Sequence, residues 1–222
     1  MREILFFAYV GVLTASAIAS AIFYRDIRTR RLGIMLPYLA YVSVQELALY
    51  FYSSPEMNSV IYNLYRPLTV IFFAMIYYPI PLMKPFRKVI LYSAIFYVVL
   101  TIINYTFIEP IDQSSRYIQL IRGFIVCFYG IFFLFGYFLL DNHEEVEYWK
   151  PLMWVTIGIV IFYPVTSIIA QLHIYLYENA ATLGGLKLYT LIPQLMSIFM
   201  YGCFTYAFYL CRKKVQISLY PS

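Results

Sequence analysis

A carboxylate and a carboxamide lie side by side in a long apolar and aromatic stretch of this chain. Residues 36–52 read LPYLAYVSVQELALYFY and contain Gln45 and Glu46. An ionised group inside a bilayer costs several kcal/mol unless a partner compensates its charge, so an intramembrane carboxylate usually marks a ligand, ion or proton site. The chemistry that these two side chains offer is the binding of a polar ligand.

Polar side chains fall at a similar depth in other apolar stretches. Glu46 lies roughly 9 Å, and Arg122 roughly 7 to 8 Å, from the same end of their stretches, because a helix rises about 1.5 Å per residue. The two opposite charges are therefore level. The residues predicted to form a ligand pocket in this half of the bundle are Glu46, Arg122, Arg66, Gln45, Gln119, Gln171, Gln194 and Asn104.

Each of these residues also has a purely structural explanation. Glu46 and Arg122 could form an ion pair that joins two helices, and the arginines could extend to the membrane surface. Asn and Gln often link neighbouring helices. Helical spacing adds two polar faces. They consist of Gln194, Ser197, Tyr201 and Thr205 in the last stretch, and of Pro164, Ser167, Gln171 and Tyr175 in the one before it.

Covalent chemistry has no candidate in the sequence. There is no HExxH, GxSxG or GxGD motif, no Gly-rich phosphate loop and no Cys/His pairing. His143 and Glu147 are one helical turn apart, but the surrounding DNHEEVE is typical of a solvated loop. Lys187 lies at the edge of the last stretch, too far out for a retinal Schiff base. We therefore predict no catalytic residue, metal site or cofactor, and a protein that is not an enzyme.

The composition indicates a protein that is solvated by lipid. Of the 222 residues, 63% are hydrophobic and 12% are charged, whereas soluble domains have about 45–50% apolar and about 25% charged residues. The predicted fold is an all-α polytopic membrane bundle whose main partner is the lipid bilayer. The net charge of +5 is interpreted as a topology signal and not as a sign of nucleic-acid binding.

Seven apolar stretches are long enough to cross a membrane, and together they form a single transmembrane domain over residues 1–222. They lie at about residues 4–24, 33–52, 62–83, 89–108, 117–140, 152–175 and 188–210. The first is predicted to be a retained helix and not a cleaved signal, because the basic sequence RDIRTRR follows it. Similar patterns at 61–72 and 188–199 suggest an internal three-plus-one-plus-three repeat.

The distribution of basic residues predicts the orientation. If the chain crosses the membrane seven times, 11 of the 16 Lys and Arg residues fall on one side and 5 on the other. Because Lys and Arg favour the cytoplasmic face, the N-terminus is expected outside and the C-terminus inside. The predicted location is the inner, cytoplasmic membrane of a bacterium, with the polar pocket in the outer half of the bundle.

Three segments carry a resemblance to known proteins. ELALYFY, NSVIYNLYRPLTVIFF and YWKPLMWVTIGIVIFYP are similar to segments of small seven-helix bacterial membrane proteins whose function is largely uncharacterised. Some of those proteins are neighbours of sensor kinases, which implies a receptor role. Pro193-Gln194 and the seven-helix count also resemble the PQ-loop and SWEET-type carriers, although the expected second Pro-Gln is missing from residues 33–83.

Three functions are compatible with these observations. The first is a receptor or sensory module that binds a small polar ligand and acts on a membrane or cytoplasmic signalling partner. It is favoured because charged residues are confined to one half of the predicted helices. The second is a SWEET-like small-solute transporter that uses the same pocket. The third is a scaffolding subunit of a membrane complex, which would dock through the basic 25–31 and acidic 141–147 loops.

Overall fold

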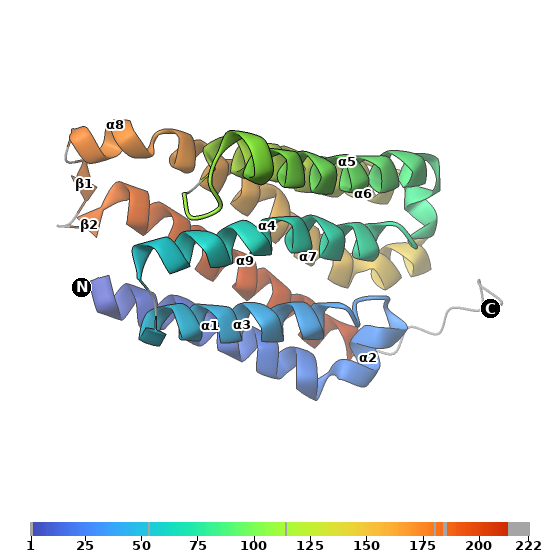
Figure 1. Cartoon of the computed structure of the whole chain (residues 1–222). Coiled ribbons are helices and arrows are strands. Elements are labelled where there is room, and N and C mark those ends of the chain that lie inside the picture. The colour runs from blue at the N-terminus through green and yellow to red at the C-terminus, as the bar shows by residue number, and fades with distance from the viewer. Residues whose placement is uncertain (1, 53, 114, 180, 184–185, 213–222) are drawn as a thin grey trace.

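Long helices account for most of the computed structural model, which describes residues 2–52, 54–113, 115–179, 181–183 and 186–212 (Figure 1). The first half contains α1 (Arg2–Ile22), α2 (Tyr24–Thr29), α3 (Met35–Tyr52), α4 (Pro55–Tyr77), the 3₁₀-helix η1 (Pro81–Phe86), α5 (Arg87–Ile103) and the π-helix η2 (Asn104–Ile108). The second half contains α6 (Arg116–Phe138), α7 (His143–Gln171), α8 (His173–Glu178), the hairpin strands β1 (Thr182–Leu183) and β2 (Leu186–Lys187), and α9 (Leu188–Cys211).

Six helical segments of the described residues are long and apolar enough to cross a membrane. They are Ile4–Ile22, Met57–Tyr77, Pro81–Ile108, Arg116–Phe138, His143–Gln171 and Leu188–Cys211. The prediction of an all-α helical bundle with membrane-spanning helices is thus confirmed. Helix α3 is not among the six. It nevertheless packs alongside α1 (Figure 1), and a seven-span architecture stays a prediction.

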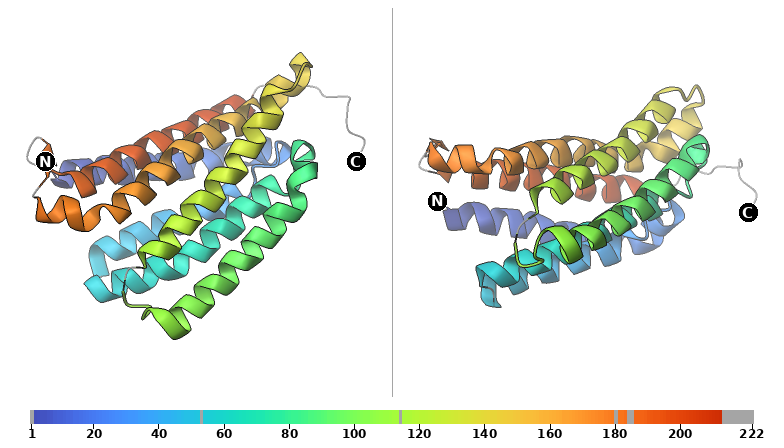
Figure 2. Two further views of the ribbon diagram at one scale, coloured as in Figure 1. Left: turned by 90° about the horizontal axis from the view of Figure 1, so that it is seen from above. Right: turned by 45° about the horizontal axis from the view of Figure 1, so that its top comes forward.

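The helices are arranged around a common interior, with α5 at the outside of the bundle (Figure 2). Helix α7 packs most extensively, against α9 on one side and α6 on the other, and α1 packs against both α9 and α3. Helix α5 contacts mainly its neighbours α4 and α6. Contact between α3 and α4 is sparse. The interior is therefore bounded by α1, α3, α4, α6, α7 and α9.

Helix capping explains why two helices begin earlier than their apolar stretches predict. Helix α4 begins at Pro55 and not near residue 62, because Ser54 accepts a hydrogen bond from the Met57 amide and proline is well suited to the first helical position. Helix α7 begins at His143 and not near residue 152, since Asn142 caps it. The 141–147 segment, expected to be a loop, is thus mostly the first turns of α7.

The last residues of the predicted spans also differ from the observed ones. Helix α4 ends at Tyr77 and α7 at Gln171, whereas the predicted spans continue to residues 83 and 175. The basic segment after the first span forms the short helix α2. The loops predicted for the cytoplasmic side gather at the end of the bundle that holds α2 (Figure 1). Two of the 11 basic residues predicted for the cytoplasmic side, Lys213 and Lys214, lie outside the described residues.

Close approach of α7 to α9 depends on Gly158. A methyl group on this residue would lie 3.1 Å from the Cys203 Cβ and 3.2 Å from the Met200 carbonyl oxygen. We expect Gly158→Ala to lower the free energy of unfolding by about 1–3 kcal/mol through overpacking. Gly202→Ala is the matched control, because it has no neighbour within 4 Å and gains about 1 kcal/mol of helix propensity. The temperature of thermal unfolding in detergent should fall for Gly158→Ala and rise for Gly202→Ala. Equal shifts for the two variants would contradict the packing at Gly158.

Candidate ligand-binding cavity

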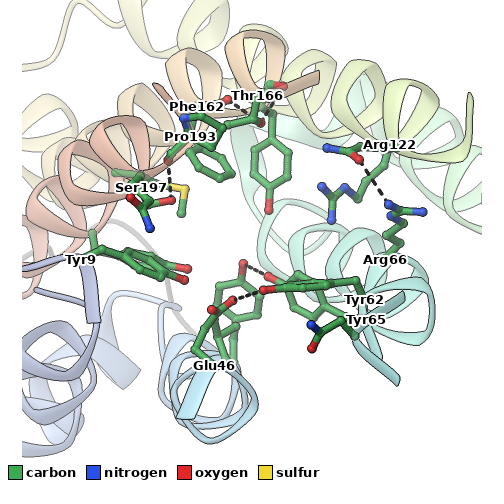
Figure 3. Close-up of a pocket in the computed structure, with 18 of the residues that line it drawn as sticks. Tyr9, Glu46, Tyr62, Tyr65, Arg66, Arg122, Phe162, Thr166, Pro193 and Ser197 are labelled. Carbon is green, nitrogen blue, oxygen red and sulfur yellow. Dashed lines mark hydrogen bonds between the residues drawn. The ribbon is translucent and has the colours of Figure 1, made fainter. Parts of the chain in front are cut away.

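A cavity of about 460 Å³ lies among six of the described helices (Figure 3). Its lining includes side chains from α1, α3, α4, α6, α7 and α9. The charged members are Glu46, Arg66 and Arg122. The neutral polar members include Asn58, Ser59, Gln119, Thr166, Gln194 and Ser197. The aromatic members are Phe6, Tyr9, Tyr38, Tyr62, Tyr65, Phe162, Tyr163 and Tyr201.

Glu46 projects from α3 on one side of the cavity (Figure 3). Its carboxylate accepts a hydrogen bond from the Tyr62 hydroxyl at 3.1 Å. The Tyr9 hydroxyl points toward the same region from α1. An ion pair between Glu46 and Arg122, one of the structural explanations that the sequence leaves open, is not present within the described part of the chain, where the single salt bridge joins Lys150 and Glu147. Glu46 is instead held by tyrosine hydroxyls.

Arg66 is held in place by a network that joins α4 to α6. It is 4% exposed and donates hydrogen bonds to the Asn63 side-chain oxygen, to the Ser115 carbonyl at 2.8 Å and to the Gln119 side chain at 3.2 Å. The Tyr105 hydroxyl lies at 3.4 Å. Asn63 extends the network, because its Nδ2 donates to the carbonyls of Ile111 and Gln113, both at 2.7 Å. Arg66 therefore has a structural role at the wall of the cavity.

Arg122 lies on the same side of the cavity as Arg66 but is not held by a hydrogen-bond network of that kind among the residues that the structure describes. Its side chain is 8% exposed, and its guanidinium lies 5.5 Å from the ring centre of Tyr163. The buried Nε has no hydrogen-bond partner. Within the described residues no carboxylate lies within ion-pair distance of this guanidinium. A buried cation next to a cavity thus lacks a protein counter-ion.

Amide groups at the cavity wall are similarly unsatisfied. The side-chain oxygens of Asn58 and Gln194 are buried and have no partner among the described residues. Buried polar atoms are nearly always hydrogen-bonded, so such exceptions often indicate a missing ligand or water. An adjoining cavity of about 450 Å³ shares Glu46, Asn58 and Gln194, and it extends toward the first turns of α9 at Thr190. The polar site is therefore approached from the end of the bundle where the N-terminus lies (Figure 1).

A layer of packed aromatic side chains lies between the cavity and the opposite end of the bundle. Phe73 is fully buried, and its ring centre lies 5.4 Å from that of Tyr38 and 5.6 Å from that of Tyr163. Beyond this layer, Tyr77 and Thr156 share a hydrogen bond of 2.9 Å between helices α4 and α7. The three charged residues of the cavity, Glu46, Arg66 and Arg122, thus lie on one side of this layer.

Five of the eight residues predicted for the pocket line the cavity. These are Glu46, Arg66, Gln119, Arg122 and Gln194. Gln45 is buried elsewhere, because adjacent helical positions point about 100° apart. Gln171 donates to the Arg116 carbonyl at 2.9 Å and so joins the end of α7 to the start of α6. Asn104 donates to the Glu109 carboxylate at 3.1 Å and stabilises the end of η2. Gln171 and Asn104 thus hold helix ends, and none of the three residues contributes to the cavity wall.

The polar faces predicted for the last two helices have different outcomes. Gln194, Ser197 and Tyr201 of α9 do line the cavity, whereas Thr205 lies outside it. On α7 the lining residues are Phe162, Tyr163 and Thr166, in place of the expected Pro164, Ser167 and Gln171. Ser167 is instead packed against α6, where its hydroxyl occupies the space above Gly123.

Sequence reasoning missed most of the tyrosines in the wall. Tyr9, Tyr38, Tyr65 and Tyr163 are not among the residues predicted from the sequence. Tyr38 and Tyr65 share a hydrogen bond of 2.7 Å, which shows that they carry polar atoms into the interior. The three- and four-residue spacing of Tyr62, Tyr65 and Arg66 with Asn58 was the signal in the sequence that a single face of α4 is polar.

The fold and the cavity define a multi-pass helical integral membrane protein with a charged interior site. Comparison with family models, with curated proteins and with solved structures found no match for this chain. No cluster of three or more His, Cys, Asp or Glu side chains that could hold a metal ion occurs in the described residues.

Proposed function

We propose that this protein is a receptor or sensory module that binds a small polar ligand in the cavity between Glu46 and Arg122. The observation that supports the proposal most directly is Arg122, which is buried at the wall of a polar cavity and has neither a counter-ion nor an Nε hydrogen bond among the described residues. A permanent structural role would normally supply a counter-ion for such a group. The ligand would enter from the end of the bundle that holds the N-terminus, which the distribution of Lys and Arg predicts to face outward. The proposed location is a bacterial inner membrane.

Ligand binding can be connected to the cytoplasmic end through the helices that form the cavity. Helix α3 leads from Glu46 to the α2 segment, and α7 leads from Tyr163 to its own first turns. There Arg30 donates to the Tyr148 carbonyl at 2.8 Å, and the Tyr148 hydroxyl donates to the Thr29 carbonyl at 3.0 Å. A ligand that draws α3 toward α6 and α7 would alter this contact. We propose that a signalling partner recognises α2 together with the start of α7.

A solute carrier is the second candidate, because helices around the cavity contain prolines. Pro193 of α9 lines the cavity, and Pro164 and Pro67 lie inside α7 and α4. Proline removes a backbone hydrogen bond and creates a site where a membrane helix can bend. Such bending, with the proposed internal repeat, would permit alternating access. The aromatic layer below the cavity favours the receptor, since a carrier also needs a polar route through the other half.

Glu46→Gln tests the proposed site and separates the two candidates. Detergent-solubilised protein would be screened for thermal protection by amino acids, organic acids and sugars. We expect the variant to bind the protecting compound about tenfold more weakly, because a charged hydrogen-bond acceptor is lost. Glu178→Gln, at an exposed position of α8, should bind like the wild type.

The same compound, labelled, would then be offered to reconstituted vesicles. A receptor should show binding without accumulation above that of empty vesicles. Counterflow that Glu46→Gln abolishes would establish the carrier and overturn the receptor. If no compound protects the protein and a membrane partner copurifies regardless of added ligand, the scaffolding role is the better explanation.

A further inference from the structure

We infer that the ligand of this cavity is a small amphoteric acid: an anionic group pairs with Arg122, and a hydrogen-bond donor faces Glu46 and Gln194. The inference rests on the proposed function and adds the chemical class of the ligand. It depends on which polar atoms of the wall already have partners in the protein and which do not.

The two arginines of the wall are not equivalent in this respect. Arg66 donates to Asn63, Ser115 and Gln119, so its donors are directed at the protein. The buried Nε of Arg122 has no hydrogen-bond partner among the described residues, and the guanidinium lies 5.5 Å from the centre of the Tyr163 ring. A guanidinium presents a planar fork of donors that matches a carboxylate or phosphate in a bidentate geometry. Arg122 is therefore the anchor for an anion.

The balance of charge at the wall leads to the same conclusion. Two guanidinium groups and one carboxylate line the cavity, and the carboxylate of Glu46 is bound to Tyr62 and not to either arginine. The cavity thus holds an excess of one positive charge that is largely removed from water. This charge attracts the anionic group of a ligand to Arg122, and burial would strengthen the attraction.

Other polar atoms of the cavity wall lack hydrogen-bond donors in the part of the chain that the structure describes. Glu46 can accept further hydrogen bonds, and the buried side-chain oxygens of Asn58 and Gln194 accept none among the described residues. An ammonium or hydroxyl group on the ligand would satisfy them. The rings of Tyr62, Tyr163 and Tyr201 also line the cavity, and they favour a flat apolar body. An acid, a donor and an apolar body are the features of an amino acid.

Compounds that share one skeleton test each part of this inference. L-phenylalanine carries both groups, 3-phenylpropionate only the acid and 2-phenylethylamine only the amine; inorganic phosphate and glucose complete the set. Thermal protection of the full-length protein in detergent would be titrated with each. We expect phenylalanine to protect best, 3-phenylpropionate less and 2-phenylethylamine not at all. Protection by phosphate alone would assign the anchor to a phosphate group and overturn the amino-acid class.

Variants of α6 then locate the anchor. Arg122→Gln should weaken phenylalanine and 3-phenylpropionate about tenfold or more, the loss expected for a charged hydrogen-bond pair. Arg122→Lys should retain part of the affinity, since it keeps the charge but not the fork. Arg116→Gln, on the same helix but outside the cavity lining, should bind like the wild type.

The outcomes distinguish this inference from the proposed function. Protection by glucose or 2-phenylethylamine without protection by the acids would overturn the inference and leave the binding pocket in place. Equal affinity of the acids for the wild type and Arg122→Gln would overturn the role of Arg122. If none of the compounds protects the protein, both the inference and the proposed pocket are wrong.

Discussion

Arg122→Met is expected to make the ligand-free protein more stable. Arg122 is 8% exposed and has no counter-ion among the described residues. Folding therefore removes its charge from water without the compensation of an ion pair. Replacing buried charges with apolar side chains of similar volume often stabilises a protein by about 1–4 kcal/mol. Most substitutions of buried residues do the opposite. A gain in stability would therefore indicate that Arg122 is kept for binding.

The measurement is thermal unfolding of the purified protein in detergent, without added ligand. Arg116→Met is the matched control, because Arg116 is a half-buried arginine in the first turn of the same helix; it should change the free energy of unfolding by less than about 0.5 kcal/mol. The stabilised Arg122→Met protein should also have lost protection by phenylalanine. A marked loss of stability in Arg122→Met would show that the guanidinium has a structural partner, and the ligand assignment would then fail.

Residue type and position along the chain were sufficient to predict the depth of the site but not its composition. Glu46, Arg66 and Arg122 could be placed at one level because helices have a constant rise and the ends of apolar stretches mark the membrane surface. Which face of a helix points inward depends on how the helices pack. On α7, residue 164 and its neighbours at helical spacing were expected to face the cavity, whereas the wall is formed by Tyr163 and Thr166.

The amides illustrate a second limit of prediction from sequence. Gln119 and Gln194 line the cavity, while Gln171 and Asn104 bind backbone or loop groups at helix ends. All four are amides near the end of an apolar stretch, and the sequence has no feature that separates the two roles. The tyrosines present the same difficulty, because one side chain supplies both a packing surface and a hydroxyl. The unsatisfied atoms of Arg122, Asn58 and Gln194 that distinguish this cavity depend on how the helices pack, which the sequence does not specify.

Arg66→Met should have the opposite effect to Arg122→Met, with a loss of about 3–5 kcal/mol, as is typical when one partner of a buried charged network is removed. Arg66 is 4% exposed, and the Ser115 carbonyl and Asn63 side chain would lose their donor. Because α6 begins at Arg116, directly after Ser115, the start of this helix and its contact with α4 should loosen. Thermal unfolding in detergent would again be measured. Arg66→Lys should recover little of the loss, since one ammonium group does not reach all these acceptors.

A double-mutant cycle with Asn63→Ala tests whether the network acts as a unit. Asn63 bonds both Arg66 and the carbonyls of Ile111 and Gln113, so the double variant should be less destabilised than the sum of the single variants, by about 0.5–3 kcal/mol. Additive losses would mean that the two residues act independently. If Arg66→Met lowers the free energy of unfolding and Arg122→Met raises it, Arg66 supports the wall and Arg122 faces the ligand. Destabilisation by both would assign the pair to structure and leave the cavity without its proposed anion anchor.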